Sequence, residues 1–436
     1  MKSIQTVVFI LAFNAKCVYS QWESSEILLQ KARTEVAILC SNSFAGRGYI
    51  QDGHHKAADY IARRYQELGL RTTGDFPDAN GISRPYQQPF PLKINVVQAT
   101  KLYIDGRFLV PGVDYITHPT TGSGEGYALV KDAGYMLDSV PMVGAGQAVV
   151  ITDGLPPAIA QDAGMKEKYK DQSNINGRVA KIQTQNPTAI LVRKKKLTAS
   201  FDEEAISTPY FEVIEDKLPT GLKQVRWQVT AGVKEFESQN VIGYLQGSIK
   251  DTFVIVSAHY DHLGKLNNAI FTGANDNASG VAMLLSMAEY FIQHQPKYSM
   301  LFVAFGGEET GLNGSRFYVM AQPIAPLAQT KFILNLDLMG AGNEGIMAVG
   351  GNDFPKLFQQ LSKINEEIKA VPIVKSRPNA PNSDHYFFLA NGVKGFFVYT
   401  MGGPSYYHDV YDTPAHLELS KFVEVRNLLL RFLEQI

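Results

Sequence analysis

The pattern of apolar and polar positions is clearest between residues 253 and 309. Two continuous apolar runs, FVIVSA at 253–258 and MLFVAF at 300–305, are each bounded by turn-forming residues. Such runs are typical of strands buried on both faces of an α/β sheet. Between them, residues 277–294 carry apolar side chains at helical spacing, namely Val281, Leu284, Leu285, Ala288 and Phe291. This stretch therefore predicts a strand, a helix and a second strand.

The same pattern extends from residue 236 to the C-terminus. Strands are predicted at 241–245, 253–258, 299–305, 331–337, 346–350 and 395–399. Helices are predicted at about 277–294, 354–369, 383–391 and 419–434. The fold class that follows is α/β, with a mixed and mostly parallel sheet flanked by helices.

The N-terminal part, residues 21–96, is predicted to be a helical portion of the same domain. Ala57, Ile61, Tyr65 and Leu68 form one apolar stripe, and Gly69 is a plausible helix end. The adjacent His54 and His55 are interpreted as solvated or capping residues. Residues 76–95 are rich in Pro, Gly and Asn and predict an irregular connection.

Residues 97–235 have a different character and predict a separate, inserted β-rich domain without chemistry of its own. Short β segments are expected at 148–152, 179–183, 189–192 and 225–229. The basic run at 193–196 has no interleaved aromatic residues, so it is interpreted as a solvated hairpin end rather than as a nucleic-acid site.

Composition limits the partners and the location. The formal net charge is −1, so no bulk charge attracts nucleic acid or an anionic membrane. Residues 1–20 predict a signal peptide, with Lys2 followed by an apolar run and a small-residue cleavage site. Its removal would leave Cys40 as the single cysteine, and no later run reaches the ~18 apolar residues of a membrane span. We therefore expect an exported protein, periplasmic or extracellular, without a transmembrane segment.

Residues that can hold a metal ion or move a proton follow the predicted strands. They are His259, Asp276 at a helix start, the pair Glu308 and Glu309, Asp337, and His408. Because the carboxyl ends of parallel strands lie at one edge of a sheet, we expect these side chains to meet there. Counting one glutamate of the pair, two histidines and three carboxylates are the ligand chemistry of Zn²⁺ or, less selectively, of Mn²⁺ or Co²⁺.

Each of these residues also has a simpler interpretation. Asp276 alone could be a helix N-cap, and the glutamate pair could be first-turn acids that a helix dipole stabilises. His259 could be a core histidine and His408 a loop histidine, but the shared placement of all of them favours a metal site. The sequence contains no His-Glu-x-x-His, Gly-x-Ser-x-Gly or phosphate-binding Gly-x-x-x-x-Gly-Lys-Ser/Thr motif.

At these positions the chain resembles the M28 zinc aminopeptidases, over nearly all of the mature chain. The segments that carry the resemblance are 258–261, 273–280, 307–315, 335–340, 383–385, 407–408 and 412–413, with 39–48 similar to the N-terminal segment of the family. The resemblance implies the zinc-exopeptidase type of sheet. It also implies that the insert is a protease-associated (PA) domain.

The resemblance further implies two zinc ions and a role for each residue. His259 and Asp337 would hold one ion, Glu309 and His408 the other, and Asp276 would bridge them. Glu308 would be the general base, Tyr407 a stabiliser of the oxyanion, and Asp261 the residue that orients His259. Asp384 and His385 match a family motif and are interpreted as structural or substrate-positioning residues, whereas His262, His294 and His416 are interpreted as surface or capping residues.

Three functions remain open at this point. The first is a di-zinc peptidase that removes N-terminal residues from peptide substrates, and the second is a glutaminyl cyclase that uses one zinc. The third is a binding protein on an inactive peptidase scaffold, which usually lacks metal ligands, whereas none is missing here. Side-chain specificity, a carboxypeptidase or dipeptidase activity, and the oligomeric state stay open.

Overall fold

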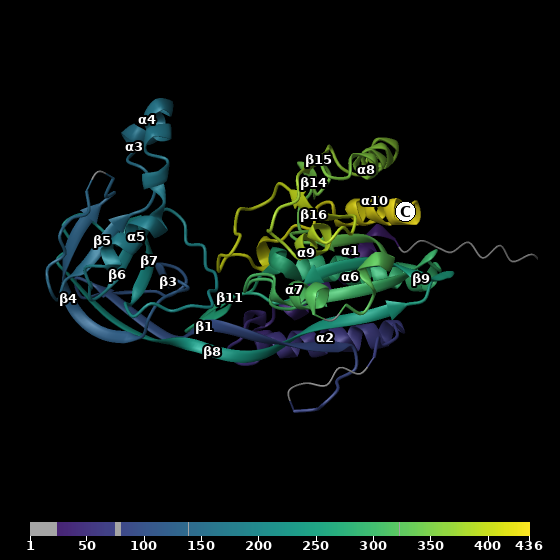
Figure 1. Cartoon of the computed structure of the whole chain (residues 1–436), viewed down its shortest axis with the longest axis horizontal. Helices are drawn as coiled ribbons and strands as arrows, with labels where there is room; N and C mark the ends of the chain where they lie inside the picture. Colours follow the sequence, from purple (N-terminus) through teal and green to yellow (C-terminus); the bar gives the residue numbers. More distant parts are fainter. Residues whose placement is uncertain (1–23, 75–79, 138, 322) are drawn as a thin grey trace, which may run out of the picture.

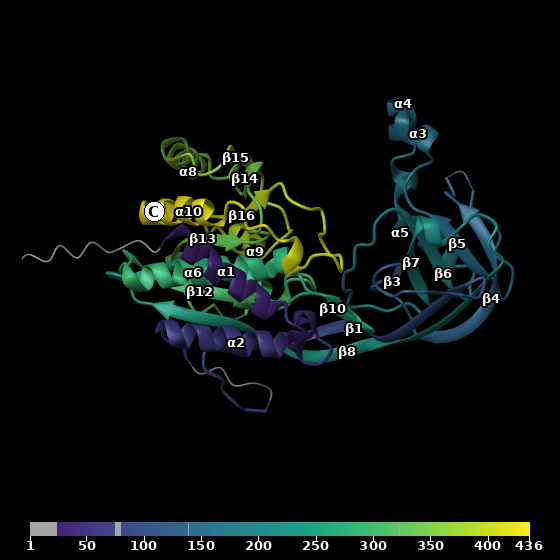
Figure 2. The ribbon, with the colours of Figure 1, turned by 180° about the vertical axis from the view of Figure 1, so that it is seen from behind.

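The computed structural model describes residues 24–74, 80–137, 139–321 and 323–436, which form two lobes (Figure 1). The α/β lobe comprises residues 24–96 and 236–436, and the inserted lobe comprises residues 97–235. The predicted signal peptide lies outside the described residues. Two long antiparallel strands, β1 (Gln87–Ile104) and β8 (Gln224–Leu245), run from one lobe into the other, as Figure 2 shows from behind. The predicted boundaries at 97 and 235 therefore fall inside continuous strands.

The sheet of the α/β lobe has the strand order β15-β14-β16-β13-β9-β12-β8. Its central strands β16, β13, β9 and β12 are parallel neighbours, while β8 and β14 pair antiparallel with β12 and β16. The mostly parallel sheet that the sequence predicted is thus confirmed. The strands are β9 (Ile249–His259), β12 (Tyr298–Phe305), β13 (Thr330–Leu336), β14 (Gly345–Val349), β15 (Val374–Arg377) and β16 (Gly395–Met401).

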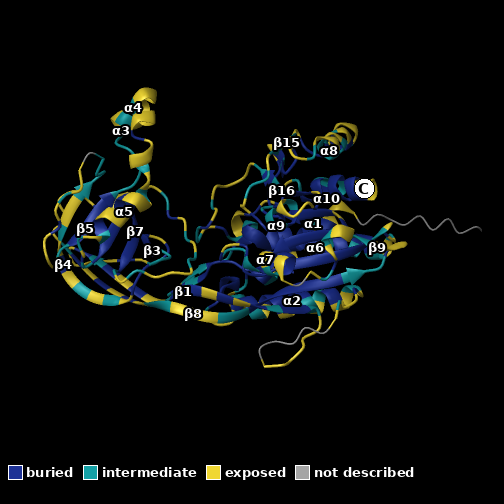
Figure 3. Cartoon of the chain, in the orientation of Figure 1, coloured by how far each residue is buried: buried dark blue, intermediate teal, exposed yellow. Residues whose placement is uncertain are grey.

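Helices cover both faces of this sheet because its central strands are apolar on both sides (Figure 3). Val254 and Val256 of β9 face one apolar core, while Ile255 faces the other. The first core includes side chains of α1 (Ser25–Leu39), α2 (Gly53–Leu68), α6 (Ser279–Gln293), α8 (Pro355–Ile368) and α10 (Phe422–Glu434). The second includes side chains of α7 (Asn313–Met320) and α9 (His385–Ala390).

The predicted N-terminal helix is α2, which ends at Gly69 in the left-handed conformation with φ +83°. Two interpretations of this region were wrong. His54 lies in the first turn of α2 and is only 1% exposed, because it packs among aromatic rings rather than in solvent. The irregular connection predicted at 76–95 is seen at 80–86, but the prediction was wrong from Gln87, where β1 starts and pairs with β8; residues 76–79 lie outside the described residues.

The inserted lobe contains strands and helices around its own apolar core. Its strands continue the sheet from β8 in the order β4-β5-β6-β7-β3. They are β2 (Arg107–Leu109), β3 (Tyr115–Thr117), β4 (Gly124–Gly134), β5 (Ala148–Thr152), β6 (Ile190–Lys194) and β7 (Tyr210–Ile214). The helices are α3 (Pro157–Gln161), α4 (Ala163–Lys168) and α5 (Ile175–Gln183), so the strand predicted at 179–183 was wrong. Asn174 caps α5 through its side chain and favours the helix there.

The basic run at 193–196 is not a solvated hairpin end, as the sequence had suggested. It ends β6, a strand inside the sheet, and Arg193 is only 8% exposed and pairs with Asp132 at 2.6 Å. Lys194 pairs with Asp153 at 2.8 Å, and Lys195 alone of the four is exposed. The charges of Arg193 and Lys194 are thus neutralised within the protein.

Several short elements lie between the main strands and helices. A hairpin of β10 (Gly264–Leu266) and β11 (Ala269–Phe271) follows β9, and η4 (Ala274–Ala278) leads into α6. The remaining short helical turns are η1 (Asn42–Arg47), η2 (Asp171–Ser173), η3 (Glu215–Lys217), η5 (Leu327–Gln329) and η6 (Pro414–His416).

Candidate metal centre

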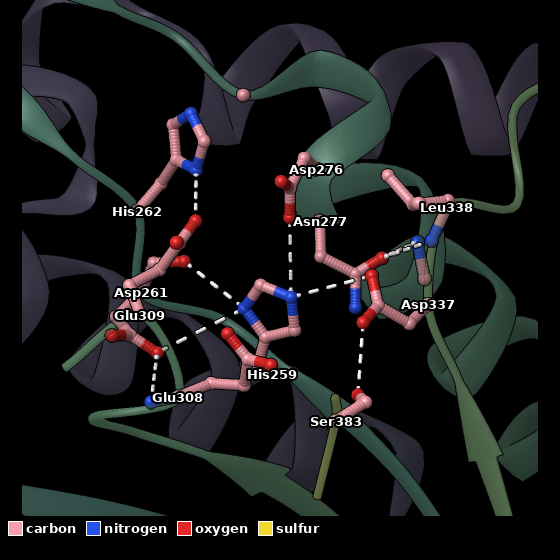
Figure 4. Close-up of polar contacts among 12 residues, drawn as sticks. His259, Asp261, His262, Asp276, Asn277, Glu308, Glu309, Asp337, Leu338 and Ser383 are labelled. Carbon is pink, nitrogen blue, oxygen red and sulfur yellow. Dashed lines mark hydrogen bonds and ion pairs between the residues drawn. The ribbon is translucent and has the colours of Figure 1, made fainter. Parts of the chain in front are cut away.

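Four neighbouring parallel strands end at the candidate site. His259 is the last residue of β9, Glu308 and Glu309 follow β12, Asp337 follows β13, and His408 lies in the loop after β16. Because β16, β13, β9 and β12 are adjacent, their carboxyl ends bring these side chains together. Figure 4 shows those of His259, Glu308, Glu309 and Asp337. The meeting of the side chains at one sheet edge is what the sequence predicted.

Asp276 lies between the two histidines. Its Oδ1 is 3.2 Å from Nε2 of His259, and its Oδ2 is 3.2 Å from Nε2 of His408. His259 Nε2 also lies 3.3 Å from Oδ1 of Asp337, and His408 Nε2 lies 3.0 Å from Oε2 of Glu309. One carboxylate therefore joins two histidine–carboxylate pairs into a single cluster.

The loop that carries Asp276 is held by Asp412. The carboxylate of Asp412 accepts hydrogen bonds from the backbone N–H groups of Asn275 at 2.9 Å and Asp276 at 3.0 Å. The peptide bond between Asp276 and Asn277 is cis. Asn277 in turn donates to the carbonyl oxygen of Leu336 at 2.9 Å, which ties η4 to the end of β13.

Both imidazoles are oriented through their other nitrogen. His408 Nδ1 donates to the carbonyl oxygen of Ala199, 2.7 Å away in the inserted lobe, and His259 Nδ1 faces the carbonyl oxygen of Asp261 at 3.3 Å. A carbonyl oxygen only accepts, so Nδ1 of His408 carries a proton, and its Nε2 is the nitrogen that faces the carboxylates. The Asp261 carboxylate is 3.9 Å from His259 Nδ1, and instead accepts from the Glu308 N–H at 3.1 Å.

His262 belongs to the site, although the sequence interpretation placed it at the surface or at a cap. Its side chain is fully buried, and its Nδ1 lies 2.6 Å from Oε1 of Glu309. The interpretation was wrong because nothing in the local pattern distinguishes His262 from an ordinary residue after a strand. The one sequence feature that could have indicated a role was its position three residues after His259. His294, by contrast, is at the end of α6 and bonds the Tyr290 carbonyl at 2.9 Å, while His416 is exposed.

Asp337 is oriented from behind by a chain of polar side chains. Ser383 donates to Oδ2 of Asp337 at 2.8 Å, and Asn335 donates to Ser383 at 2.8 Å. The neighbouring Asp384 and His385 are fully buried. Burial raises the pKa of Asp384 to about 7 and lowers that of His385 to about 3.

The electrostatics of the cluster call for positive charge between the carboxylates. Burial raises the pKa of Glu308 well above its usual range, and the charges of Glu309 and Asp337 add to the rise. Burial acts in the same direction on Glu309, but His408 and His262 together outweigh it and lower the pKa of Glu309 to about 2. Burial opposes charge on His408 too, yet Glu309 and Asp276 raise the pKa of His408 to about 11.

The donor set fits divalent metal ions. Within the described ranges, two groups have ligand atoms within 4.8 Å of one another: His259 with Glu308 and Asp337, and His259 with Asp276 and Glu309. No lysine or arginine of the described chain forms an ion pair with these carboxylates. Buried carboxylates without such a partner need a cation, and imidazole nitrogens with carboxylate oxygens are zinc ligands.

Tyr407 lies at the rim of the cluster. Its ring stacks on the imidazole of His408 at 3.8 Å between centroids, and the residue is 50% exposed. Burial of the hydroxyl, together with the charges of Asp276 and Glu309, raises the pKa of Tyr407, so the phenol stays protonated.

Known metallopeptidases are similar to the α/β lobe. Residues 240–433 match the profile of peptidase family M28. Among solved structures, a zinc aminopeptidase from Bacillus subtilis is similar over 93% of this chain and 94% of that one, with a TM-score of 0.70 and 19% identity. A peptidase M28 precursor from Shewanella amazonensis covers 94% of both chains, with a TM-score of 0.66 and 18% identity. The chain shares their fold, and its matched part is a metallopeptidase domain.

Curated relatives correct the predicted location. Vacuolar membrane proteases of Schizophyllum commune and Saccharomyces cerevisiae are each 28% identical to this chain, over 207 and 185 residues. These matches cover 46% and 42% of the chain, which spans about a fifth of either relative: 21% and 18%. Their names point to a vacuolar membrane, so the predicted periplasmic or extracellular location was wrong. In the part of the chain that the structure describes, no helix is long and apolar enough to cross a membrane.

Proposed function

We propose that this chain is a di-zinc aminopeptidase that hydrolyses the N-terminal peptide bond of peptides. The observation that carries the proposal is the position of Asp276, whose two oxygens each lie 3.2 Å from Nε2 of a different histidine. A carboxylate in this position can bridge two metal ions, which is the arrangement of two-metal hydrolases. The M28 match of residues 240–433 supports the same chemistry.

The five ligand residues divide into two sets around Asp276. His259 and Asp337 would hold one zinc ion, and Glu309 and His408 would hold the other. Bound Zn²⁺ ions would polarise the scissile carbonyl and lower the pKa of a water molecule towards neutrality. That the chain binds two ions, and that both are zinc, is part of the proposal.

Glu308 is the residue that moves the proton. Its carboxylate takes a proton from the attacking water and delivers it to the nitrogen of the leaving amine. The upward direction of the pKa shift of Glu308, caused by burial, suits this task, because a carboxylate that holds a proton more readily can both accept and release it. Glu309 cannot serve in the same way, since both of its oxygens face histidines: Oε1 faces His262 and Oε2 faces His408.

Tyr407 donates a hydrogen bond to the developing oxyanion. Its phenol is protonated, and its ring is fixed by stacking on His408 next to the ligands. A neutral donor placed where charge develops stabilises the transition state more than the ground state.

Specificity for a free N-terminus is part of the proposal and is supported by the names of similar structures. Two similar structures are named aminopeptidases, that of Bacillus subtilis and one from Aneurinibacillus with a TM-score of 0.63. The inserted lobe, residues 97–235, is assigned as a PA-like domain on its position in the chain and its separate core.

The test is hydrolysis of a matched pair of substrates by the zinc-loaded chain. Leucine p-nitroanilide should be cleaved, and the N-acetylated compound should not, because acetylation removes the charged amine. Loss of activity on chelation and recovery with zinc complete the expected result. Equal cleavage of both compounds, or cyclisation of an N-terminal glutamine in place of hydrolysis, would overturn the proposal.

A further inference from the structure

The loop that carries His408 is held from the inserted lobe. His408 Nδ1 donates to the carbonyl oxygen of Ala199 at 2.7 Å, and the N–H of Ala199 donates back to the carbonyl oxygen of His408 at 3.1 Å. Ala199 lies between β6 and β7, more than two hundred positions before His408. The two residues thus form a reciprocal pair across the junction of the lobes, where Figures 1 and 2 show the loop after β16 reaching towards the inserted lobe.

Lys196 strengthens the same junction. Its Nζ donates to the carbonyl oxygens of Ser405 at 2.8 Å and Tyr407 at 3.1 Å. One side chain of the inserted lobe therefore holds two carbonyl groups of the three residues that precede His408. A cation can satisfy both at once because the ammonium group carries three donors.

Before His408 the loop itself is largely exposed. Gly402 and Gly403 have φ values of +95° and +82°, and residues 402–405 are exposed. His408 has a φ of +56°, in the left-handed region that is unfavourable for a residue with a side chain. Within its own lobe, the ring of Tyr406 contacts that of His416 with centroids 5.0 Å apart, and the carbonyl oxygen of Asp412 accepts from Ala274 at 3.1 Å. Contacts from the inserted lobe therefore act on His408 together with its pairing to Asp276 and Glu309.

Apolar packing keeps the two lobes at this spacing. Phe201 of the inserted lobe packs edge-on against Tyr49, with ring centroids 5.6 Å apart. Tyr49 in turn donates to the carboxylate of Asp261 at 3.0 Å. The segment 196–201 thus lies near both histidine ligands. Ala199 contacts His408 directly through its backbone, and Phe201 contacts Tyr49, which binds Asp261 close to His259.

From these contacts we infer that the segment 196–199 of the inserted lobe positions His408, so that the inserted lobe is a structural part of the metal centre. Ala199 fixes the ring by its carbonyl group, and Lys196 is the positioning residue that fixes the backbone. The inference rests on the proposed function, because it assigns His408 as a zinc ligand. It gives the insert, which carries no catalytic residue, a role in metal affinity.

The test compares two adjacent lysines in the full-length chain. Lys196→Ala removes the contacts to the loop, whereas Lys195→Ala changes an exposed neighbour with the same loss of charge. Zinc affinity is measured by competition with a chromophoric chelator, and the unfolding midpoint is measured in EDTA. The visible spectrum of the Co²⁺-substituted proteins reports ligand geometry independently of activity.

We expect Lys196→Ala to weaken one of the two zinc equivalents by about tenfold, the lower end of the ~10–100-fold effect of groups that orient metal ligands. The cobalt spectrum should change, the midpoint in EDTA should not, and Lys196→Arg should restore affinity. Lys195→Ala should match the wild type. Unchanged affinity in Lys196→Ala, or an equal loss in Lys195→Ala, would overturn the inference while leaving the di-zinc proposal intact. A wild-type chain that binds no zinc would refute both.

Discussion

His262 and Glu309 form the shortest imidazole–carboxylate contact of the described site, with Nδ1 2.6 Å from Oε1. The other oxygen of Glu309 lies 3.0 Å from Nε2 of His408. One oxygen of Glu309 therefore contacts His262, while its other oxygen faces the proposed ligand His408. This is the relationship expected of a carboxylate ligand whose orientation is set by a neighbouring donor.

Replacing His262 should weaken zinc binding without removing a ligand. His262→Ala leaves Oε1 of Glu309 without its donor, so the carboxylate loses its fixed orientation and zinc affinity should fall by roughly 10–100-fold. Chelator competition measures the loss, and the exposed His416 gives a matched control as His416→Ala. Equal affinity in the two variants would show that His262 has no such role.

Glu308 separates metal binding from turnover. Glu308→Gln keeps the size of the side chain but removes the proton acceptor, so turnover should fall by several orders of magnitude. Zinc content should stay at the wild-type level, since the proposed ligands are unchanged. Single-turnover rates on leucine p-nitroanilide, with metal analysis of the same sample, make the comparison. Near-normal turnover would refute the assignment of Glu308 as the base.

Arg47 should be among the residues on which stability depends most. Its guanidinium is fully buried and donates to carbonyl oxygens on both sides of the site, those of Leu39, Tyr260, Thr272, Gly273 and Asp276. Arg47→Met would leave these acceptors unpaired in the interior, at a cost of about 3–5 kcal/mol. Urea unfolding measures this loss against Arg63→Met, an exposed arginine that should change stability by no more than about 0.5 kcal/mol. Similar midpoints for both variants would contradict the account.

Because His54 is buried, we predict that the folded protein loses stability in acid. Burial, with a contribution from His55, lowers the pKa of His54 to about 3, so the unfolded chain binds a proton at a higher pH than the folded one. Its contribution to stability is complete above the usual histidine pKa and is lost as the pH falls towards 3, by up to about 1.4 kcal/mol per pH unit.

The pH effect is measured as a difference between two proteins, because the pKa values of His118 and His385 are lowered in the same direction. His54→Phe places an apolar ring among Tyr49 and Phe236 and should reduce the pH dependence of the unfolding free energy between pH 6.5 and 4. Parallel curves for the variant and the wild type would contradict a neutral, buried His54.

The α/β lobe could be predicted from the sequence because its signals are local. Each central strand is one apolar run, and His259, Glu308 and Asp337 come directly at or after strand ends, so that parallel pairing brings them together. The end of helix α5 was misassigned as a strand because the short apolar segment at 179–183 fits both the helical repeat and the strand repeat of apolar positions.

The contacts that complete the site could not be predicted, because they join distant parts of the chain. The basic run at 193–196 has the appearance of a solvated end until β6 places Arg193 beside Asp132 and Lys196 beside Ser405. Likewise, His262 acquires its role only from the approach of Glu309. Side-chain patterns show which face of an element is buried, but they do not show which polar partners lie across it.

The number of zinc ions per chain is the measurement that tests the central claim most directly. The purified chain is reconstituted with zinc, freed of excess metal and submitted to elemental analysis. The bridging position of Asp276 between His259 and His408 predicts two equivalents. One equivalent would contradict the bridged site and favour single-zinc chemistry, and none would contradict a metal centre altogether.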